Sequence, residues 1–213
     1  MKKHLLLLGT SLLLICCQSA KQEPQATVPP TENATAIAPD ATVTDYLHVP
    51  GPVSFSQVDY ILNWSSHPSE TYYKHEYLPK GENPEHYSQM IMLEMALGDL
   101  VAMDIAKGKA DEINGRKGAD PLAGYTIGEN KGTGEVLLDF MLSEGSGETA
   151  IAEWNSYRYK TYVGPSGQKG IMLFALSKRG YGADVNAFAA DMKANHKKYV
   201  AEFEGVKFPE VKL

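Results

Sequence analysis

Residues 171–176 place the strongest constraint on the fold, because all six of them are apolar. A strand that is apolar at successive positions needs cover on both of its faces. We therefore expect this segment to be a central strand of a sheet, with other parts of the chain packed above and below it.

Turn residues divide the rest of the sequence into hairpins. Seven strands are expected, at residues 58–64, 71–78, 89–95, 122–128, 135–142, 149–163 and 169–178. The turn between the first two is predicted at His67-Pro68-Ser69. Glycine-rich stretches at residues 128–134 and 164–170 join the later pairs. Because both stretches lie between strands and not before a helix, we interpret them as hairpin turns and not as phosphate loops.

Two stretches follow helical spacing. Residues 97 to about 116 are expected to be the first helix, with Gly115 or Gly118 ending it in a left-handed cap. Its apolar face would consist of Leu97, Leu100, Val101, Ile105 and Ile113. Residues 184–203 predict the second helix, with Asp184 as its N-cap and Gly205 at its end. Its apolar face would consist of Val185, Phe188, Ala189, Met192, His196, Tyr199, Val200 and Phe203.

Runs of strands joined by hairpins predict an α+β fold. We expect an antiparallel sheet of about six or seven strands with two main helices packed on it. Phe208 and Val211 follow the second helix and are expected to pack back on the sheet. The sequence has no internal repeat.

The N-terminus has the layout of a bacterial lipoprotein signal. Lys2 and Lys3 precede an apolar run at residues 5–15, which is too short to span a bilayer. Leu14-Ile15-Cys16-Cys17 resembles a lipobox, and Cys17 is the expected lipidated residue because Cys16 is then the small residue before the cut. Lipidation at Cys16 stays an alternative, as does an ordinary cleaved leader without lipid.

Three regions follow from this layout: a signal peptide at residues 1–16, a lipidated Cys17 with a flexible tether to residue 50, and one α+β domain at residues 51–213. The tether is rich in Pro, Ala, Thr and Glu and lacks aromatic residues up to residue 40, so it cannot bury a core. The predicted location is the bacterial cell envelope, with the outer membrane favoured because Gln18, and not Asp, follows Cys17. Which side of that membrane the domain faces stays open.

The charge balance excludes some partners. The chain carries 20 basic and 26 acidic residues, and removal of Lys2 and Lys3 with the leader leaves a formal charge of −8. An acidic chain of this kind is not expected to bind nucleic acid, which needs Lys and Arg to neutralise phosphate. Membrane contact should come from the lipid alone. With Cys17 acylated, no intramolecular disulfide can form.

Two stretches carry a family resemblance. The first is Asn63-Trp64 followed by residues 76–87, and the second is residues 153–159 together with residues 177–182. Together they resemble uncharacterised exported lipoproteins of Gram-negative bacteria, of the Bacteroidetes type. The order of elements is similar to the PsbP/DcrB-like fold, which implies a curved antiparallel sheet with helices on its faces. The resemblance supplies no catalytic residues.

Charged residues on the later strands are the candidate ligand-binding residues: Glu153, Arg158, Lys178, Arg179 and Tyr181. Glu153 and Arg158 are five apart and so should point to opposite faces of a regular strand. Arg158 could pair with Asp139 or line a groove. The last three lie where a strand turns into the final helix, where an anionic ligand could bind. The alternative is that these residues seal the end of the sheet and pair with local acids.

The remaining chemistry-bearing residues suggest structural roles. His67, His75 and His86 are expected to be exposed hairpin histidines, since they lack the short spacing of a metal site. Trp64 and Trp154 are expected to be core anchors. No G-x-S-x-G motif is present. No catalytic residue, metal site or cofactor is predicted.

Two functional hypotheses remain. The first is a non-enzymatic, membrane-tethered module that binds another envelope protein or a small ligand, or that serves envelope assembly. The second is a hydrolase or other enzyme whose dispersed polar site includes Glu153, Arg158 and Arg179. The sequence does not indicate an oligomeric state.

The lipid anchor can be tested directly. Labelled palmitate should enter the wild-type protein in a bacterial host, and replacement of both Cys16 and Cys17 by serine should abolish the label, because no acyl acceptor then remains. Equal labelling of both proteins would contradict the anchor.

Overall fold

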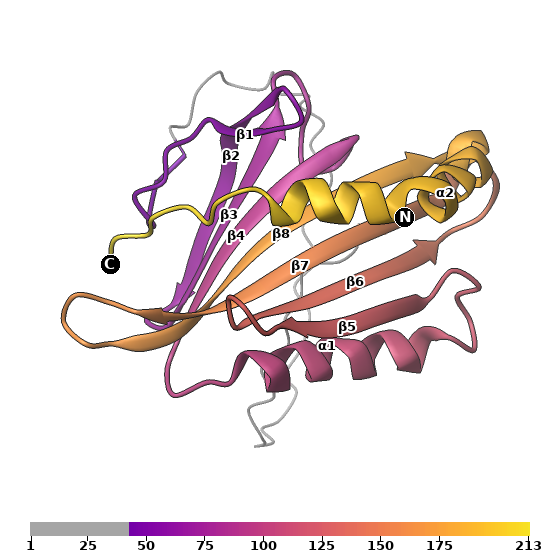
Figure 1. The fold of residues 1–213 in the computed structure, drawn as a ribbon. Coiled ribbons are helices and arrows are strands. Elements are labelled where there is room, and N and C mark those ends of the chain that lie inside the picture. Colours follow the sequence, from indigo (N-terminus) through magenta and orange to yellow (C-terminus); the bar gives the residue numbers. More distant parts are fainter. Residues whose placement is uncertain (1–42) are drawn as a thin grey trace, which may run out of the picture. The chain divides into compact units, whose positions relative to one another are not determined.

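An eight-stranded antiparallel sheet with two α-helices forms the part of the chain described by the computed structural model, residues 43–213 (Figure 1). The predictions for the signal peptide, for Cys17 and for the tether up to residue 42 lie outside these residues. Within residues 43–213, neither helix combines the length and hydrophobicity needed to cross a bilayer.

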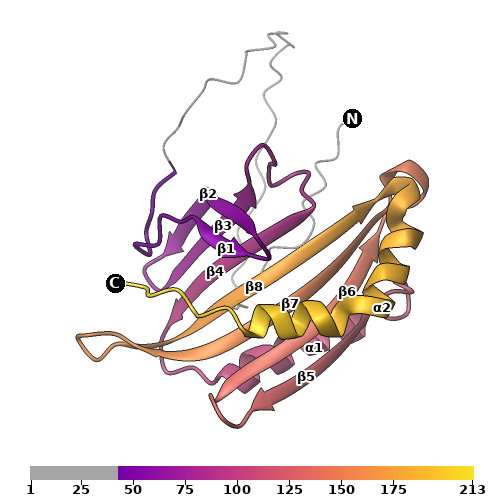
Figure 2. The same cartoon turned by 45° about the horizontal axis from the view of Figure 1, so that its top comes forward.

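The strand order is β1-β2-β3-β4-β8-β7-β6-β5, and every neighbouring pair is antiparallel. Figure 2 shows how the sheet curls, with α2 lying across β7 and β8. The strands are β1 (Val53–Phe55), β2 (Val58–Ser69), β3 (Tyr72–Pro79), β4 (Gln89–Leu97), β5 (Gly124–Asn130), β6 (Glu135–Glu144), β7 (Ile151–Val163) and β8 (Lys169–Tyr181). The helices are α1 (Ala102–Arg116) and α2 (Val185–Glu204), with short 3-10 turns η1 (Gly147–Thr149) and η2 (Gly182–Asp184).

The predicted fold class is confirmed, but the strand count is wrong. The sheet has eight strands and not six or seven, because β1 pairs with the first three residues of β2. A strand of three residues is too short to show an alternating pattern, so the sequence gives no signal for it. The three predicted hairpins are present as β2–β3, β5–β6 and β7–β8.

The first predicted turn is also wrong. His67, Pro68 and Ser69 lie inside β2, which continues to Ser69 before the chain reverses. The pairing of β2 with β3 shifts register between Ser66 and Ser69, and again between Leu62 and Trp64. A bulge accommodates Pro68 near the end of the strand, where a proline without an N–H is tolerated.

The apolar run at residues 171–176 forms the middle of β8, between β4 and β7, as predicted. All six side chains are buried. The alternation of β8 sends Met172, Phe174 and Leu176 toward α2, while its odd-numbered residues point to the opposite face.

Helix α2 covers the first of these faces, which we call the α2 face. Its predicted apolar residues are all at least partly buried, and Met192 and Phe203 are fully so. Phe208 and Val211 pack back on the same core, as predicted. Gly205 ends the helix, but Asp184 makes no side-chain capping bond and belongs to η2.

Helix α1 packs on β5, β6 and β7 through Ala102, Ala106, Ala110 and Ile113. The predicted start is therefore wrong, and of the predicted apolar face Ile113 is buried and Ile105 half-buried, whereas Leu97, Leu100 and Val101 precede the helix. Leu97 ends β4, and Gly98, at φ +141° in a region that favours glycine, donates its N–H to Lys169. Val101, with 58% of its surface exposed, precedes the helix. The helix ends at Lys117 in a right-handed conformation, so neither Gly115 nor Gly118 forms the predicted left-handed cap.

The packed domain begins before the predicted boundary at residue 51. Leu47 is completely buried in the core of the α2 face, and its carbonyl accepts a hydrogen bond from the N–H of Lys212. The first and last parts of the described chain therefore pack together.

Gly180 gives a test of how closely α2 approaches the sheet. A Cβ at this position would lie 2.5 Å from the Cβ of Phe188, whereas a Cβ at Gly128 of β5 would meet nothing within 4 Å. Gly180→Ala should therefore lower the free energy of unfolding by about 1–3 kcal/mol in urea titrations. Gly128→Ala, the matched control, should change it by less than about 0.5 kcal/mol. Equal stability of the two variants would contradict this close contact.

Candidate functional site

The five predicted site residues do not form one site, because they divide between the two faces of the sheet. Trp154 points into the core of the α2 face, so alternation along β7 places Arg158 on that face and Glu153 on the opposite one. Pairing with β8 puts Arg179 beside Glu153 and Lys178 beside Trp154. The dispersed enzyme site of Glu153, Arg158 and Arg179 is therefore not assembled.

Glu153 and Arg179 form a buried ion pair at one end of the sheet. Only 4% of the surface of Glu153 is exposed. Its carboxylate also accepts hydrogen bonds from the hydroxyl of Tyr87 at 2.9 Å and from the amide of Asn155 at 2.9 Å. Burial alone would lower the pKa of Arg179, but the neighbouring Glu153 raises it above the ordinary value.

Tyr87 connects this ion pair to the loop before β4. Its ring lies 4.2 Å from the guanidinium carbon of Arg179, and burial with the nearby Glu153 raises the pKa of its hydroxyl. The hydroxyl of Tyr181 accepts from the N–H of Tyr87 at 3.0 Å and donates to its carbonyl at 2.9 Å. The ring of His86 stacks on Tyr181. These contacts fix the loop to the end of the sheet.

Lys178 serves the other face. Its ammonium lies 3.7 Å from the centre of the Tyr199 ring, which belongs to α2. Burial lowers the pKa of Lys178, although Asp191 and Glu202 of the helix oppose this effect. Lys178 thus helps to seat α2 on the sheet.

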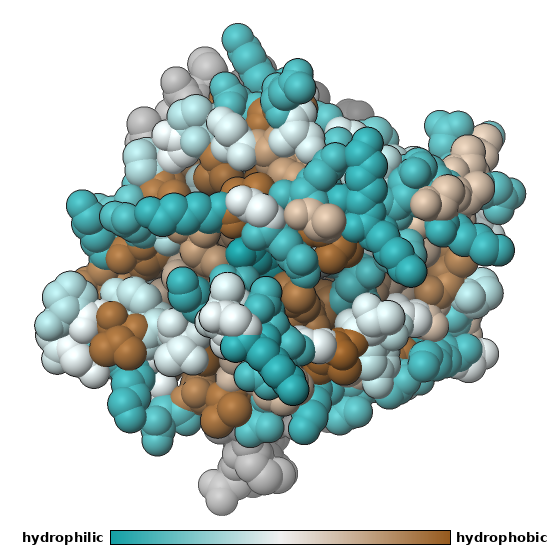
Figure 3. Space-filling view, in the orientation of Figure 1, coloured by the Kyte–Doolittle hydropathy of each residue, from teal (hydrophilic) through white to brown (hydrophobic). Residues whose placement is uncertain are grey.

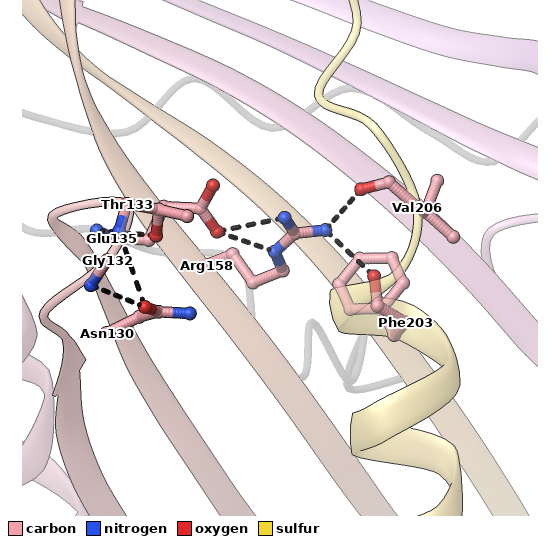
Figure 4. A network of polar contacts seen from close by, with 7 residues as sticks. All are labelled: Asn130, Gly132, Thr133, Glu135, Arg158, Phe203 and Val206. Carbon is pink, nitrogen blue, oxygen red and sulfur yellow. Dashed lines mark hydrogen bonds and ion pairs between the residues drawn. The ribbon is translucent and has the colours of Figure 1, made fainter.

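Arg158 holds the C-terminal end of α2 (Figure 4). Its guanidinium donates to Glu135 through Nε at 3.1 Å and Nη2 at 2.9 Å, and through Nη1 to the carbonyls of Phe203 at 2.8 Å and Val206 at 2.6 Å. The side chain is only 4% exposed and lies 4.7 Å from the Phe208 ring centre. Four of its five N–H groups are used in this way.

The predicted pairing of Arg158 with Asp139 is wrong. The carboxylate of Asp139 instead accepts a hydrogen bond from the indole N–H of Trp154. Burial raises the pKa of Asp139, although the Trp154 hydrogen bond opposes it. Arg158 reaches Glu135 instead. Leu137 of β6 lies opposite Arg158, so Glu135 and Asp139 flank it on the same face, and Asp139 is already bound to Trp154.

A pocket of about 240 Å³ opens beside Arg158. Its walls come from the β5–β6 turn, from β7 and from the chain that leaves α2. Its lining residues are Asn130, Thr133, Glu135, Leu137, Arg158, Lys160, Glu204, Gly205, Val206, Lys207 and Phe208. In Figure 3, hydrophobic and hydrophilic side chains alternate over this face of the molecule and form no single large apolar patch.

Sequence reasoning found Arg158 but missed the other pocket residues. Lys160 lies two positions further along the same strand, so the period of a strand could have placed it on the same face. Glu135, Lys207 and Phe208 come from distant segments, and no spacing in the sequence links them to Arg158.

The histidines and tryptophans correct two further predictions. His67 and His86 are exposed as predicted, but His75 is completely buried. Trp154 is a core anchor as predicted, whereas Trp64 is 42% exposed. Within residues 43–213, no group of three His, Cys, Asp or Glu side chains is arranged to hold a metal ion.

Fold and site together define an α+β protein with a curled antiparallel sheet, two helices and a small polar pocket. Residues 47–208 match the model of an uncharacterised protein family, and the chain belongs to that family. No curated protein and no solved structure matches the chain.

The Arg158–Glu135 pair can be tested by a double-mutant cycle. Arg158→Met should lower the free energy of unfolding by about 3–5 kcal/mol, since it leaves the Glu135 carboxylate buried without a partner. Adding Glu135→Leu removes that unpaired charge, so the double variant should be more stable than the sum of the single losses implies.

The matched control is Lys169→Met, which breaks the exposed ion pair with Asp99 and should cost less than about 1 kcal/mol. Urea titrations of all four variants measure these differences. If the losses in free energy of unfolding for Arg158→Met and Glu135→Leu simply add up in the double variant, the ion pair does not hold the site together.

Proposed function

We propose that the protein is a lipoprotein of the bacterial cell envelope, anchored through an acyl group on Cys17, that acts as a non-enzymatic binding or envelope-assembly module. The basic start, the short apolar run and the two adjacent cysteines support the anchor. The proposed location is the outer membrane. The proposed relatives are exported lipoproteins of the Bacteroidetes type, and the proposed fold is PsbP/DcrB-like.

The pocket beside Arg158 is the observation that carries the binding role. Three elements far apart in the sequence build it, and the Arg158 network holds them in place. Binding residues on a preorganised scaffold lose little conformational freedom when a ligand arrives. A tethered domain with such a pocket could capture a ligand near the membrane.

The lining of the pocket favours a small ligand with one apolar part and one anionic group. Leu137, Val206 and Phe208 supply apolar surface. Arg158 is neutralised by Glu135. Lys160, Lys207 and Glu204 are the remaining charged residues of the lining, and the exposed ammonium of Lys207 also lies 3.3 Å from Glu210. Two ammonium groups on flexible stems suit a carboxylate or phosphate.

The candidate reactive residues give less support to the enzyme alternative. Glu153 accepts bonds from three side chains, Arg179 and Tyr181 hold the Tyr87 loop, and Arg158 lies on the other face. A general acid or base must reach a substrate, and these groups are committed to structural partners.

Benzoate, which joins an apolar ring to one carboxylate, is a suitable probe for the pocket. In a titration of the full chain followed by NMR, we expect the amide signals of Thr133, Lys160 and Lys207 to shift and saturate together. Lys160→Glu combined with Lys207→Glu should weaken binding at least tenfold, because the two ammonium groups then become carboxylates.

Lys131→Glu is the matched control, since Lys131 lies on the same β5–β6 turn but does not line the pocket. It should bind benzoate as the wild type does. Equal weakening by Lys131→Glu, or shifts spread evenly over the surface, would contradict a ligand site at this place.

A further inference from the structure

The first described residues are fastened to the sheet by a buried histidine. Residues 45–49 lie against β2 and β3, with Leu47 fully buried among them. His75 of β3 is also completely buried. The hydroxyl of Ser65 donates to the carbonyl of Thr44 at 2.6 Å, which ties the same segment to β2.

The hydrogen bonds around His75 define its tautomer. The N–H of Tyr46 donates to Nε2 at 3.1 Å, so Nε2 carries no proton. The ring proton is then on Nδ1, which donates to the hydroxyl of Tyr77 at 3.0 Å. That hydroxyl in turn donates to the carbonyl of Val49 at 2.7 Å. One neutral imidazole thus holds the segment at both Tyr46 and Val49.

We propose that His75 is a proton-operated latch, which holds residues 45–49 on the sheet while its ring is neutral and releases them when Nε2 gains a proton. A protonated Nε2 turns an acceptor into a donor that faces the N–H of Tyr46. Two donors cannot share a hydrogen bond, and the buried cation lacks solvent. The segment can relieve both problems by moving away from the sheet.

The groups that face His75 decide the direction of the effect. Burial lowers the pKa of His75, and Asp45, with Oδ1 3.8 Å from Nδ1, opposes this. Asp45 also accepts the N–H of Val49 at 2.8 Å. On β2 the facing titratable group is His67, whose ring packs against Tyr46, and on β3 it is Tyr77. The neighbour of His75 on β4 is the apolar Leu93.

The latch therefore closes at neutral pH and weakens in acid. When residues 45–49 are packed on the sheet (the docked state), the neutral ring of His75 is favoured. When they are detached (the released state), His75 titrates near its ordinary pKa of 6.5. Above that pH the docked state is unaffected. Below it, each unit of pH favours release about tenfold until the docked ring also titrates.

Release would change how the domain is held. Residues 45–49 would add roughly 3.4 Å each to the connection that precedes the domain, or about 17 Å in all when extended. This consequence rests on the proposed membrane anchor, whereas the latch itself does not.

Hydrogen–deuterium exchange of the full chain tests the latch. After correction for intrinsic rates, protection of the Tyr46 and Val49 amides should be constant above about pH 6.5 and fall about tenfold per pH unit below it. His75→Gln keeps an acceptor but cannot be protonated, so its protection should not depend on pH. His67→Gln loses the ring contact with Tyr46 but leaves His75 in place, so its protection should keep the wild-type dependence on pH whatever its overall level.

Three results would overturn the proposal. The first is equal protection of residues 45–49 at pH 7.5 and 5.0 in the wild type, and the second is the same acid response in His75→Gln. The third is nitrogen NMR of the wild-type ring at pH 7.5 that shows the proton on Nε2 instead of Nδ1. Loss of the palmitate anchor would leave both measurements unchanged, so failure of the proposed function is distinguishable.

Discussion

The guanidinium of Arg158 joins three parts of the chain that meet at one end of the sheet. It neutralises Glu135 at the start of β6, and it donates hydrogen bonds to two carbonyls where α2 ends and the C-terminal tail begins. The last carbonyls of a helix lack partners within the helix, and a cation there also meets the negative end of the helix dipole. The position of α2 on the sheet and the walls of the pocket both depend on this one side chain.

A second buried cation repeats this arrangement on the opposite face. Arg179 pairs with Glu153 there, and Lys74 lies 2.9 Å from Glu76. Such pairs add little net stability, because desolvation offsets most of the attraction. Their effect is on the arrangement of the segments. A buried charge without its partner is costly, so each pair favours the one packing in which both charges meet. Residues 43–213 contain no cysteine, so packing and these polar contacts determine how loops and helices are seated.

Local patterns predicted the parts of the fold that depend on neighbours in sequence. The apolar run of β8 reflects cover on both of its faces, and the hairpins reflect the turn residues between strands. The spacing of α2 reflects one face in the core and the other in water. The failures involve pairing between distant segments. Nothing local distinguishes β1, and pairing with β8 as far as Lys169 keeps Leu97 and Gly98 at the end of β4 instead of in α1. The partner of Arg158 likewise depended on the register of β6 against β7, which places Glu135 and Asp139 on either side of it.

The C-terminal tail contacts both the pocket and residues 45–49. Val206 and Phe208 line the pocket, and four residues after Phe208 the N–H of Lys212 donates to the carbonyl of Leu47 at 3.2 Å. Phe208 also packs on Phe174 in the core that encloses Leu47. The pocket and residues 45–49 could affect each other only if the tail had two packed arrangements and each site changed the balance between them. The tail contacts the core at both ends, so the pocket and residues 45–49 share one packed element, with Phe208 at the pocket and Lys212 at Leu47.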